Sequence, residues 1–190
     1  MNKWDTRFLK LAKEIATWSK DPSTQVGAIA VRDRQILATG YNGFPKGIED
    51  KEQTLNNRES KLRLMVHGEM NMIFNAVEHG VNLKDSTVYV WGLPVCEDCF
   101  KGLIQVCVSR VFMPDIEMHA KKWKHGCEFG KCKMKDVGIQ VDEYNMYHSW
   151  SWEELDRNNF GPGGVKEAIK NARAGQSVFN LDKNHGDEIE

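Results

Sequence analysis

Two short polar motifs, each at the start of a predicted helix, constrain how this chain can fold. His67-Gly68-Glu69 lies within VHGEMNMIFNA (66–76), a stretch otherwise apolar enough to be buried. Cys96 and Cys99 open CEDCFKGLIQVC (96–107), a second stretch with helical character. Burying an imidazole or a carboxylate without a partner costs free energy. The fold must therefore supply compensating groups, and we expect it to bring the two helix starts together.

The residue types in these motifs match the ligand chemistry of a catalytic zinc ion. A C-x-x-C motif lets two thiolates bind one ion from a single turn, and His67 can supply a third ligand. Three protein ligands leave the fourth tetrahedral position open for water, whose pKa zinc lowers toward neutrality. Glu69, two residues from His67, is placed to carry protons. We therefore predict zinc bound by His67, Cys96 and Cys99, with Glu69 as the catalytic acid and base.

Each motif taken alone has a simpler explanation. An isolated C-x-x-C occurs in structural zinc sites and in redox pairs, and a lone Glu at a helix start interacts with the helix dipole. Together and in this order, however, the residues match H-x-E followed by P-C-x-x-C, a recognised signature of zinc deaminases. Two departures leave the ligands intact. Gly68 stands where alanine is usual, and Pro94 lies one residue further from Cys96.

Composition indicates a globular protein of the cytoplasm. The 190 residues are 41% hydrophobic and 28% charged, which suits one ordinary domain, or one domain plus an appendage. No apolar run could span a bilayer, and the charged N-terminus does not resemble a signal peptide. The five cysteines are an odd number in a chain of a size that needs no disulfides. A net charge of −1 argues against broad nucleic-acid binding.

The order of predicted elements favours an α/β fold around one sheet. Helical periodicity covers about 5–19 and 66–79, and a third helix starts at the C-x-x-C motif. Strands are predicted in QVGAIAV (25–31), QILATGYN (35–42), STVYVWG (86–92), RVFMPD (110–115) and the end of CKMKDVGIQVDEY (132–144), with a hairpin turn at RDRQ. Residues about 49–63 are polar enough to form an exposed insertion. We predict one domain over 1–150 and a C-terminal extension over 151–190, of unknown role, with a short helix at about 165–173.

Four stretches resemble the deoxycytidylate (dCMP) deaminases of the cytidine deaminase superfamily. They are WSKDPSTQVGAIAV, GYNGFPKG, HGEMNMI and LPVCEDC, and the likeness extends over roughly residues 4–144. The resemblance implies a three-layer α/β/α sandwich with a central mixed sheet. It also implies one catalytic Zn²⁺ per subunit and hydrolysis of dCMP to dUMP and ammonia, which feeds thymidylate synthesis. Glu69 would move protons between the water, N3 and the leaving amine.

The resemblance also suggests substrate contacts. Asn42, in the YNG loop, matches the family residue that contacts the nucleotide sugar. Ser23 and Thr24, in DPST, are candidates for the phosphate side, although a simple turn between a helix and a strand explains them equally well.

Regulation is a further implication of the resemblance. Many family members are hexamers that dCTP with Mg²⁺ activates and dTTP inhibits. The GYNGFPKG loop, with Tyr41, Gly43 and Gly47, lies near that regulatory site in such enzymes. For the two glycines, backbone freedom is an alternative explanation.

Other functions and a second metal site remain open from the sequence. The same zinc centre could serve deamination of dCTP or deoxycytidine. A tRNA or single-stranded DNA base deaminase would need a basic, aromatic-lined channel, which the even charge balance does not favour. A non-catalytic zinc module would not need Glu69. An accessory zinc could use His119, His125, Cys127 and Cys132, or these residues could belong to a polar surface helix with reduced thiols.

Overall fold

The computed structural model describes residues 1–119 and 123–145, with the side chains of 118 and 119 left aside, and these residues belong to one compact unit, Met1–Asn145. Its centre is a five-stranded sheet in the order β2-β1-β3-β4-β5. The strands are β1 (Gly27–Arg32), β2 (Gln35–Tyr41), β3 (Thr87–Trp91), β4 (Arg110–Pro114) and β5 (Gln140–Tyr144). The predicted extension over 151–190 and its helix at about 165–173 lie outside the described residues.

The sheet is mixed, as the family resemblance implies. β1 pairs antiparallel with β2 on one side and with β3 on the other, whereas β3, β4 and β5 run parallel. The predicted turn at RDRQ is confirmed: Arg32 pairs with Gln35, and Asp33 and Arg34 between them have φ of 53° and 65°. Two successive positive φ values are those of a type I′ turn, whose twist matches that of the flanking strands.

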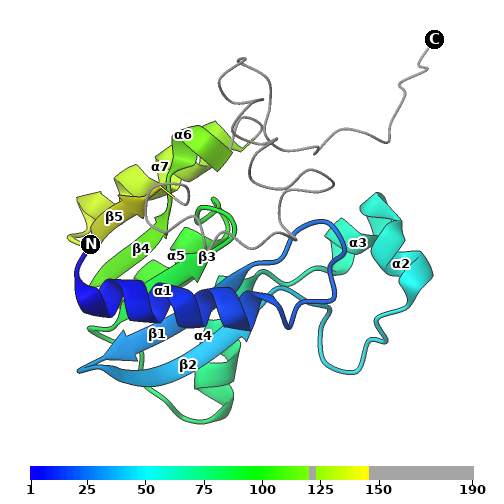
Figure 1. Cartoon of the computed structure of the whole chain (residues 1–190), viewed down its shortest axis with the longest axis horizontal. Helices are drawn as coiled ribbons and strands as arrows, with labels where there is room; N and C mark the ends of the chain where they lie inside the picture. The colour runs from blue at the N-terminus through cyan, green and yellow to red at the C-terminus, as the bar shows by residue number, and fades with distance from the viewer. Residues whose placement is uncertain (120–122, 146–190) are drawn as a thin grey trace. The chain divides into compact units, whose positions relative to one another are not determined.

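Helices cover both faces of the sheet (Figure 1). α1 (Lys3–Ala16) packs on β1, β2 and β3 from one face. The other face carries α4 (Gly68–Glu78), α5 (Cys99–Gln105) and α7 (Lys124–Asp136). Strand residues alternate between the two layers: Val88 and Val90 join the core under α4 and α5, while Tyr89 faces α1. The predicted three-layer α/β/α sandwich is therefore confirmed.

The start of α4 lies close against β2. A Cβ added at Gly40 would lie 2.2 Å from the backbone nitrogen of Met72 and 2.4 Å from the carbonyl oxygen of Gly68. Only glycine permits this approach, which brings the first turn of α4 directly over the sheet. The position of Glu69, in that turn, depends on it.

The expected exposed insertion is present, with one buried residue. The polar stretch at about 49–63 forms α2 (Glu52–Asn56) and α3 (Arg58–Leu64), which are largely exposed, but Lys61 is buried. Cys107, at the end of an apolar run that would favour a core position, is instead exposed, with φ of 57° just after α5 ends. A short α6 (Ile116–His119) completes the described helices, none of which is long and apolar enough to cross a membrane.

Candidate metal centre and active site

The three predicted metal ligands come together at the starts of α4 and α5. His67 is the N-cap residue of α4, and Cys99 is the first residue of α5, one turn after Cys96. Both helices lie on the same face of the sheet and contact each other, so their N-termini meet although β3 separates them in the sequence. Both helix N-termini also favour the anionic thiolate form of cysteine.

The geometry of the three ligands suits a zinc ion. Nδ1 of His67 lies 3.2 Å from Sγ of Cys96 and 3.4 Å from Sγ of Cys99. All three ligand atoms lie within 4.8 Å of one another. Tetrahedral zinc, with Zn–N of about 2.0 Å and Zn–S of about 2.3 Å, requires N···S separations of roughly 3.6 Å. The donor set is therefore nearly preorganised for zinc, and an ion would need only small adjustments.

Hydrogen bonds among the ligands polarise them strongly. Contacts with Cys99 and then with His67 lower the pKa of Cys96 to about 4. The hydrogen bond to Cys96 raises the pKa of His67 to about 9, and the neighbouring Cys96 thiolate together with burial raises the pKa of Cys99. Cys96 is therefore a thiolate at neutral pH, and its neighbours His67 and Cys99 keep their protons. A divalent cation would displace those protons, because metal ligands bind in their deprotonated forms.

Glu69 is buried beside the ligands without being one of them. Its exposed fraction is 3%, and the ligand group consists of His67, Cys96 and Cys99. Burial, followed by the negative charge of Cys96, raises the pKa of Glu69 to about 7. A carboxyl group with a pKa near neutrality can both accept and release a proton, as a general acid and base must.

The side chain of Asn42 is buried and bonded to the backbone of the loop before β1. Its Oδ1 accepts from the backbone N–H of Val26 at 2.7 Å, and its Nδ2 donates to the carbonyl oxygen of Thr24 at 2.9 Å. The Asn42 carbonyl oxygen accepts from the hydroxyl of Ser19. Asn42 thus holds the loop in place whether or not it also contacts a substrate.

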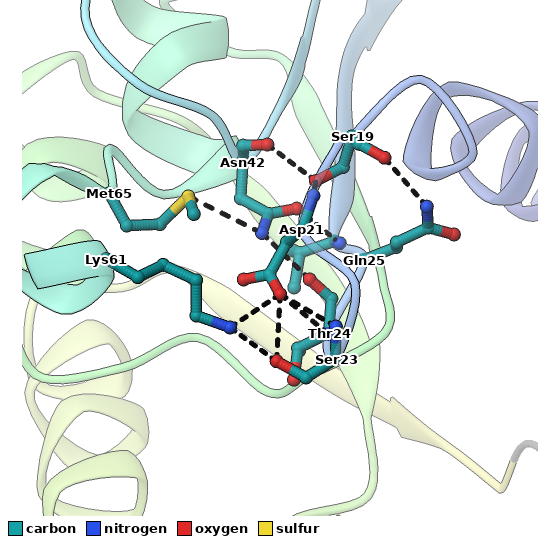
Figure 2. Close-up of polar contacts among 9 residues, drawn as sticks. Ser19, Asp21, Ser23, Thr24, Gln25, Asn42, Lys61 and Met65 are labelled. Atoms are coloured by element: carbon teal, nitrogen blue, oxygen red, sulfur yellow. Dashed lines mark hydrogen bonds and ion pairs between the residues drawn. The ribbon is translucent and has the colours of Figure 1, made fainter. Parts of the chain in front are cut away.

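Ser23 and Thr24 belong to a turn organised by Asp21 (Figure 2). Oδ1 of Asp21 accepts from the backbone N–H groups of Ser23 and Thr24, at 2.9 and 3.2 Å, and from the Ser23 hydroxyl at 2.8 Å. This is an Asx turn, which agrees with the simpler explanation offered from the sequence. Lys61 of α3 also reaches Asp21, and sequence reasoning missed both residues. The D-P-S-T motif could have indicated Asp21, whereas Lys61 looks like any lysine of a polar helix.

The candidate regulatory residues follow the same loop. Tyr41 ends β2, and its ring makes an edge contact with Trp18 at 6.1 Å between centroids. Gly43 pairs with Val66, next to His67, through two backbone hydrogen bonds of 3.1 and 2.9 Å. Gly47 has φ of 86°, so backbone freedom does explain this glycine.

The residues of the possible accessory zinc site are dispersed where they are described. Cys127 is buried in the core, and Cys132 is exposed on α7. Within residues 1–117 and 123–145, the catalytic ligands are the single group of three potential metal ligands. The side chain of His119 lies outside the described part of the chain.

Comparison with known proteins identifies relatives of this chain. Residues 2–114 match the family described as the cytidine and deoxycytidylate deaminase zinc-binding region. An uncharacterised deaminase of Aliivibrio fischeri is 32% identical over 142 residues, covering 74% of this chain and 93% of that protein. A probable deoxycytidylate deaminase of Caenorhabditis elegans is 42% identical over 110 residues, 56% of this chain and 54% of that protein. The match therefore spans about half of the nematode relative.

Among solved structures, the dCMP deaminase of cyanophage S-TIM5 in complex with dCMP and dUMP has the same fold. The TM-score is 0.61 at 22% identity, over 76% of this chain and 99% of that one. At this identity the likeness establishes the architecture, and the site rests on the residues described above.

Proposed function

This chain belongs to the family of cytidine and deoxycytidylate deaminases with a zinc-binding region, and from that premise we propose that it hydrolyses dCMP to dUMP and ammonia. The observation that carries the proposal is the convergence of His67, Cys96 and Cys99 beside a buried Glu69 whose pKa is raised to about 7. A structural zinc site has no use for such a carboxyl group. The reaction would supply dUMP for thymidylate synthesis.

The residues of the site divide the chemistry between them. Zinc held by the three ligands would supply Lewis-acid chemistry and lower the pKa of a water molecule to about 7. Glu69 takes a proton from the attacking water as the C4–O bond forms, and donates to N3 of the cytosine ring. It then takes the remaining proton from the new C4 hydroxyl and transfers it to the amine as the C4–N bond breaks, so that ammonia leaves, the C4 carbonyl of uracil forms and the carboxylate is regenerated. Its burial keeps bulk water from competing for these protons.

The choice of dCMP rests on the named relatives and on the loops around the site. Relatives from mouse and human are named deoxycytidylate deaminases, and the cyanophage enzyme was solved with dCMP and dUMP. We assign the sugar contact to Asn42 and the phosphate contacts to Ser23 and Thr24. Their loop is held rigidly by Asp21 and Asn42, as a preorganised binding loop requires.

Regulation and assembly complete the proposal. We propose a cytoplasmic homo-oligomer, a hexamer, that dCTP with Mg²⁺ activates and dTTP inhibits through the loop of Tyr41, Gly43 and Gly47. All five cysteines are free thiols, which suits a reducing compartment. Two backbone hydrogen bonds join Gly43 to Val66, which precedes His67. A ligand that moves this loop would therefore change the position of a metal ligand.

Ammonia release from the zinc-loaded protein tests the function. The substrates are dCMP, dCTP, deoxycytidine and cytidine, each with and without dCTP–Mg²⁺ or dTTP, with zinc quantified in the same sample. We expect turnover of dCMP above that of the other three, stimulated by dCTP and suppressed by dTTP. Preferred turnover of dCTP or deoxycytidine would reassign the substrate. Bound zinc without turnover of any of the four would contradict the proposal.

A further inference from the structure

Lys61 is a buried charged residue that the chemistry above does not use. Its side chain is 10% exposed, whereas the next residue, Leu62, is 51% exposed. Lysine is almost never buried unless paired, and an apolar side chain would pack at lower cost. α3 therefore buries its lysine and exposes its leucine, the reverse of what packing alone would select. The buried pair of Lys61 with Asp21 is the feature of interest.

Lys61 has one charged partner and one neutral partner. Nζ donates to Oδ1 of Asp21 at 2.7 Å and to Oγ of Ser23 at 2.5 Å (Figure 2). The Asp21 carboxylate also accepts two backbone N–H groups and a hydroxyl from its own turn, so Lys61 is one of several donors that keep this carboxylate ionised. Burial alone would raise the pKa of Asp21, but the hydrogen bonds from Lys61 and Ser23 hold it below its ordinary value.

Lys61 also lies at an accessible place. Ser23, which it contacts, is an exposed residue, and the Lys61 side chain itself keeps an exposed fraction of 10%. An ammonium has three N–H donors, and the contacts with Asp21 and Ser23 engage two of them. The third can reach a ligand oxygen at the same surface without breaking the pair.

A path of direct contacts joins the metal centre to this lysine. A Cβ on Gly68, between His67 and Glu69, would lie 3.1 Å from the carbonyl oxygen of Val26. The N–H of Val26 donates to Asn42, and Asn42 donates to Thr24, next to Ser23.

A second path follows the chain from α3. Met65, the C-cap residue of α3, places its sulfur 3.7 Å from Nδ2 of Asn42, and Val66 leads directly to His67. Along these contacts, the metal centre is followed by Asn42 and then by the Ser23–Lys61 pair. The base, the sugar and the 5′-phosphate of a nucleotide follow one another in the same way.

We propose that Lys61 binds the 5′-phosphate of the substrate and makes the site specific for a nucleoside monophosphate over a nucleoside. This inference rests on the proposed function and names a residue for its phosphate specificity. Asp21 holds the ammonium in position while no phosphate is bound. A phosphate carries up to two negative charges, and Ser23 and Thr24 offer it only neutral hydroxyl and amide donors. Lys61 provides a positive charge to pair with the negative charges of the phosphate.

Calorimetric titration of dUMP, the reaction product, into the zinc-loaded full chain tests the assignment. Lys61→Met should weaken dUMP binding roughly 10- to 100-fold, the effect of losing a charged hydrogen bond. Lys61→Arg should retain most of the affinity. Lys51→Met, an exposed lysine in the same polar stretch, is the matched control and should leave the affinity unchanged.

Asp21→Asn separates phosphate binding from docking of α3. The amide oxygen can still accept from the turn, and a negative charge near the phosphate disappears, so dUMP affinity should fall less in Asp21→Asn than in Lys61→Met. If the pair merely docks α3, Asp21→Asn and Lys61→Met should weaken binding alike, and that result would overturn the inference. Unchanged dUMP affinity in Lys61→Met would overturn it as well. A wild-type protein that turns over no dCMP and binds no dUMP would contradict the proposed function itself, a distinguishable outcome.

Discussion

At the scale of single residues, the chemistry of the site depends on which of its buried groups are charged. Glu69 and Cys96 both lie in the same small volume, yet burial raises the pKa of Glu69 to about 7 while hydrogen bonds lower that of Cys96 to about 4. The thiolate is thus prepared to bind a cation, and the carboxyl is prepared to exchange protons. Gly68 lies between His67 and Glu69, where alanine is usual in the family. A Cβ added at Gly68 would lie 3.1 Å from the carbonyl oxygen of Val26, so alanine would fit here only tightly.

Glu69→Gln should separate metal binding from catalysis. Glutamine has the shape of glutamate but cannot carry the proton, so we expect deamination to fall by about 10²-fold or more. Zinc content should stay at one equivalent, because Glu69 is not a ligand. Ammonia release and metal analysis of one preparation check both. Exposed Glu59→Gln serves as the control, and retained turnover in Glu69→Gln would remove this residue from the mechanism.

Cys99→Ser should remove zinc and weaken the fold. Cys99 is fully buried, and serine replaces a soft thiolate by a poorer ligand with an unpaired hydroxyl. We expect zinc content near zero and a melting temperature lower by several degrees, since about 1 kcal/mol corresponds to about 2–4 °C in a chain of this size. The matched control is Cys107→Ser at an exposed position. Full zinc content in Cys99→Ser would mean that the ligand set is wrong.

At the scale of helices and strands, regular patterns made most of the fold predictable. Alternation and helical periodicity located the five strands, α1 and α4 to within a few residues, whereas α7 was anticipated only as a possible polar surface helix. The motif order predicted which helix starts would meet. Lys61 and Cys107 were not predictable, because their burial depends on tertiary contacts. Lys61 is buried by the distant Asp21, and Cys107 is exposed because α5 ends two residues earlier, at Gln105. Periodicity describes one element at a time and does not contain such contacts.

Gly40→Ala tests whether the contact of α4 with β2 positions the site. The added Cβ would lie 2.2 Å from the backbone of Met72, so α4 must move away from the sheet. We expect a loss of about 3 kcal/mol in unfolding free energy, at the upper end for overpacking, together with loss of activity as Glu69 shifts. Denaturant unfolding measures the stability. Gly43→Ala is the control, because its Cβ would have its nearest neighbour, the Tyr41 ring, at 3.8 Å. Equal stability of the two variants would contradict the argument.

At the scale of the whole molecule, one ionic network ties the first helix to the last strands. Arg110 at the start of β4 donates to Asp5 of α1 at 2.7 Å and to Asp142 of β5, and the Tyr89 hydroxyl also donates to Asp5 at 3.0 Å. Asp5 is buried, with an exposed fraction of 2%. Burial opposes its ionisation, but Arg110 and the helix cap hold the pKa of Asp5 below its ordinary value of 3.8.

Asp5→Ala should cost about 3 kcal/mol at neutral pH, because it leaves Arg110 without its buried partner. The lowered pKa means that this contribution is complete above pH 3.8 and disappears as pH falls through the folded-state value. The difference in unfolding free energy between wild type and variant should therefore narrow in acid. Denaturant titrations from pH 7 downward measure it. Asp136→Ala, which breaks an exposed pair, should cost less than about 1 kcal/mol. A pH-independent difference for Asp5→Ala would exclude its ionisation as the cause.

The order of the metal ligands along the chain has a consequence for how the protein matures. His67 precedes β3 and the two cysteines follow it, and β3 lies between β1 and β4 in the finished sheet. A chain in which β3 has not yet been inserted presents only the C-x-x-C pair, so high affinity for zinc develops after the longest-range strand pairing is made. We therefore expect uptake of the ion during refolding to be limited by strand insertion and not by diffusion, so that only completely folded molecules hold zinc.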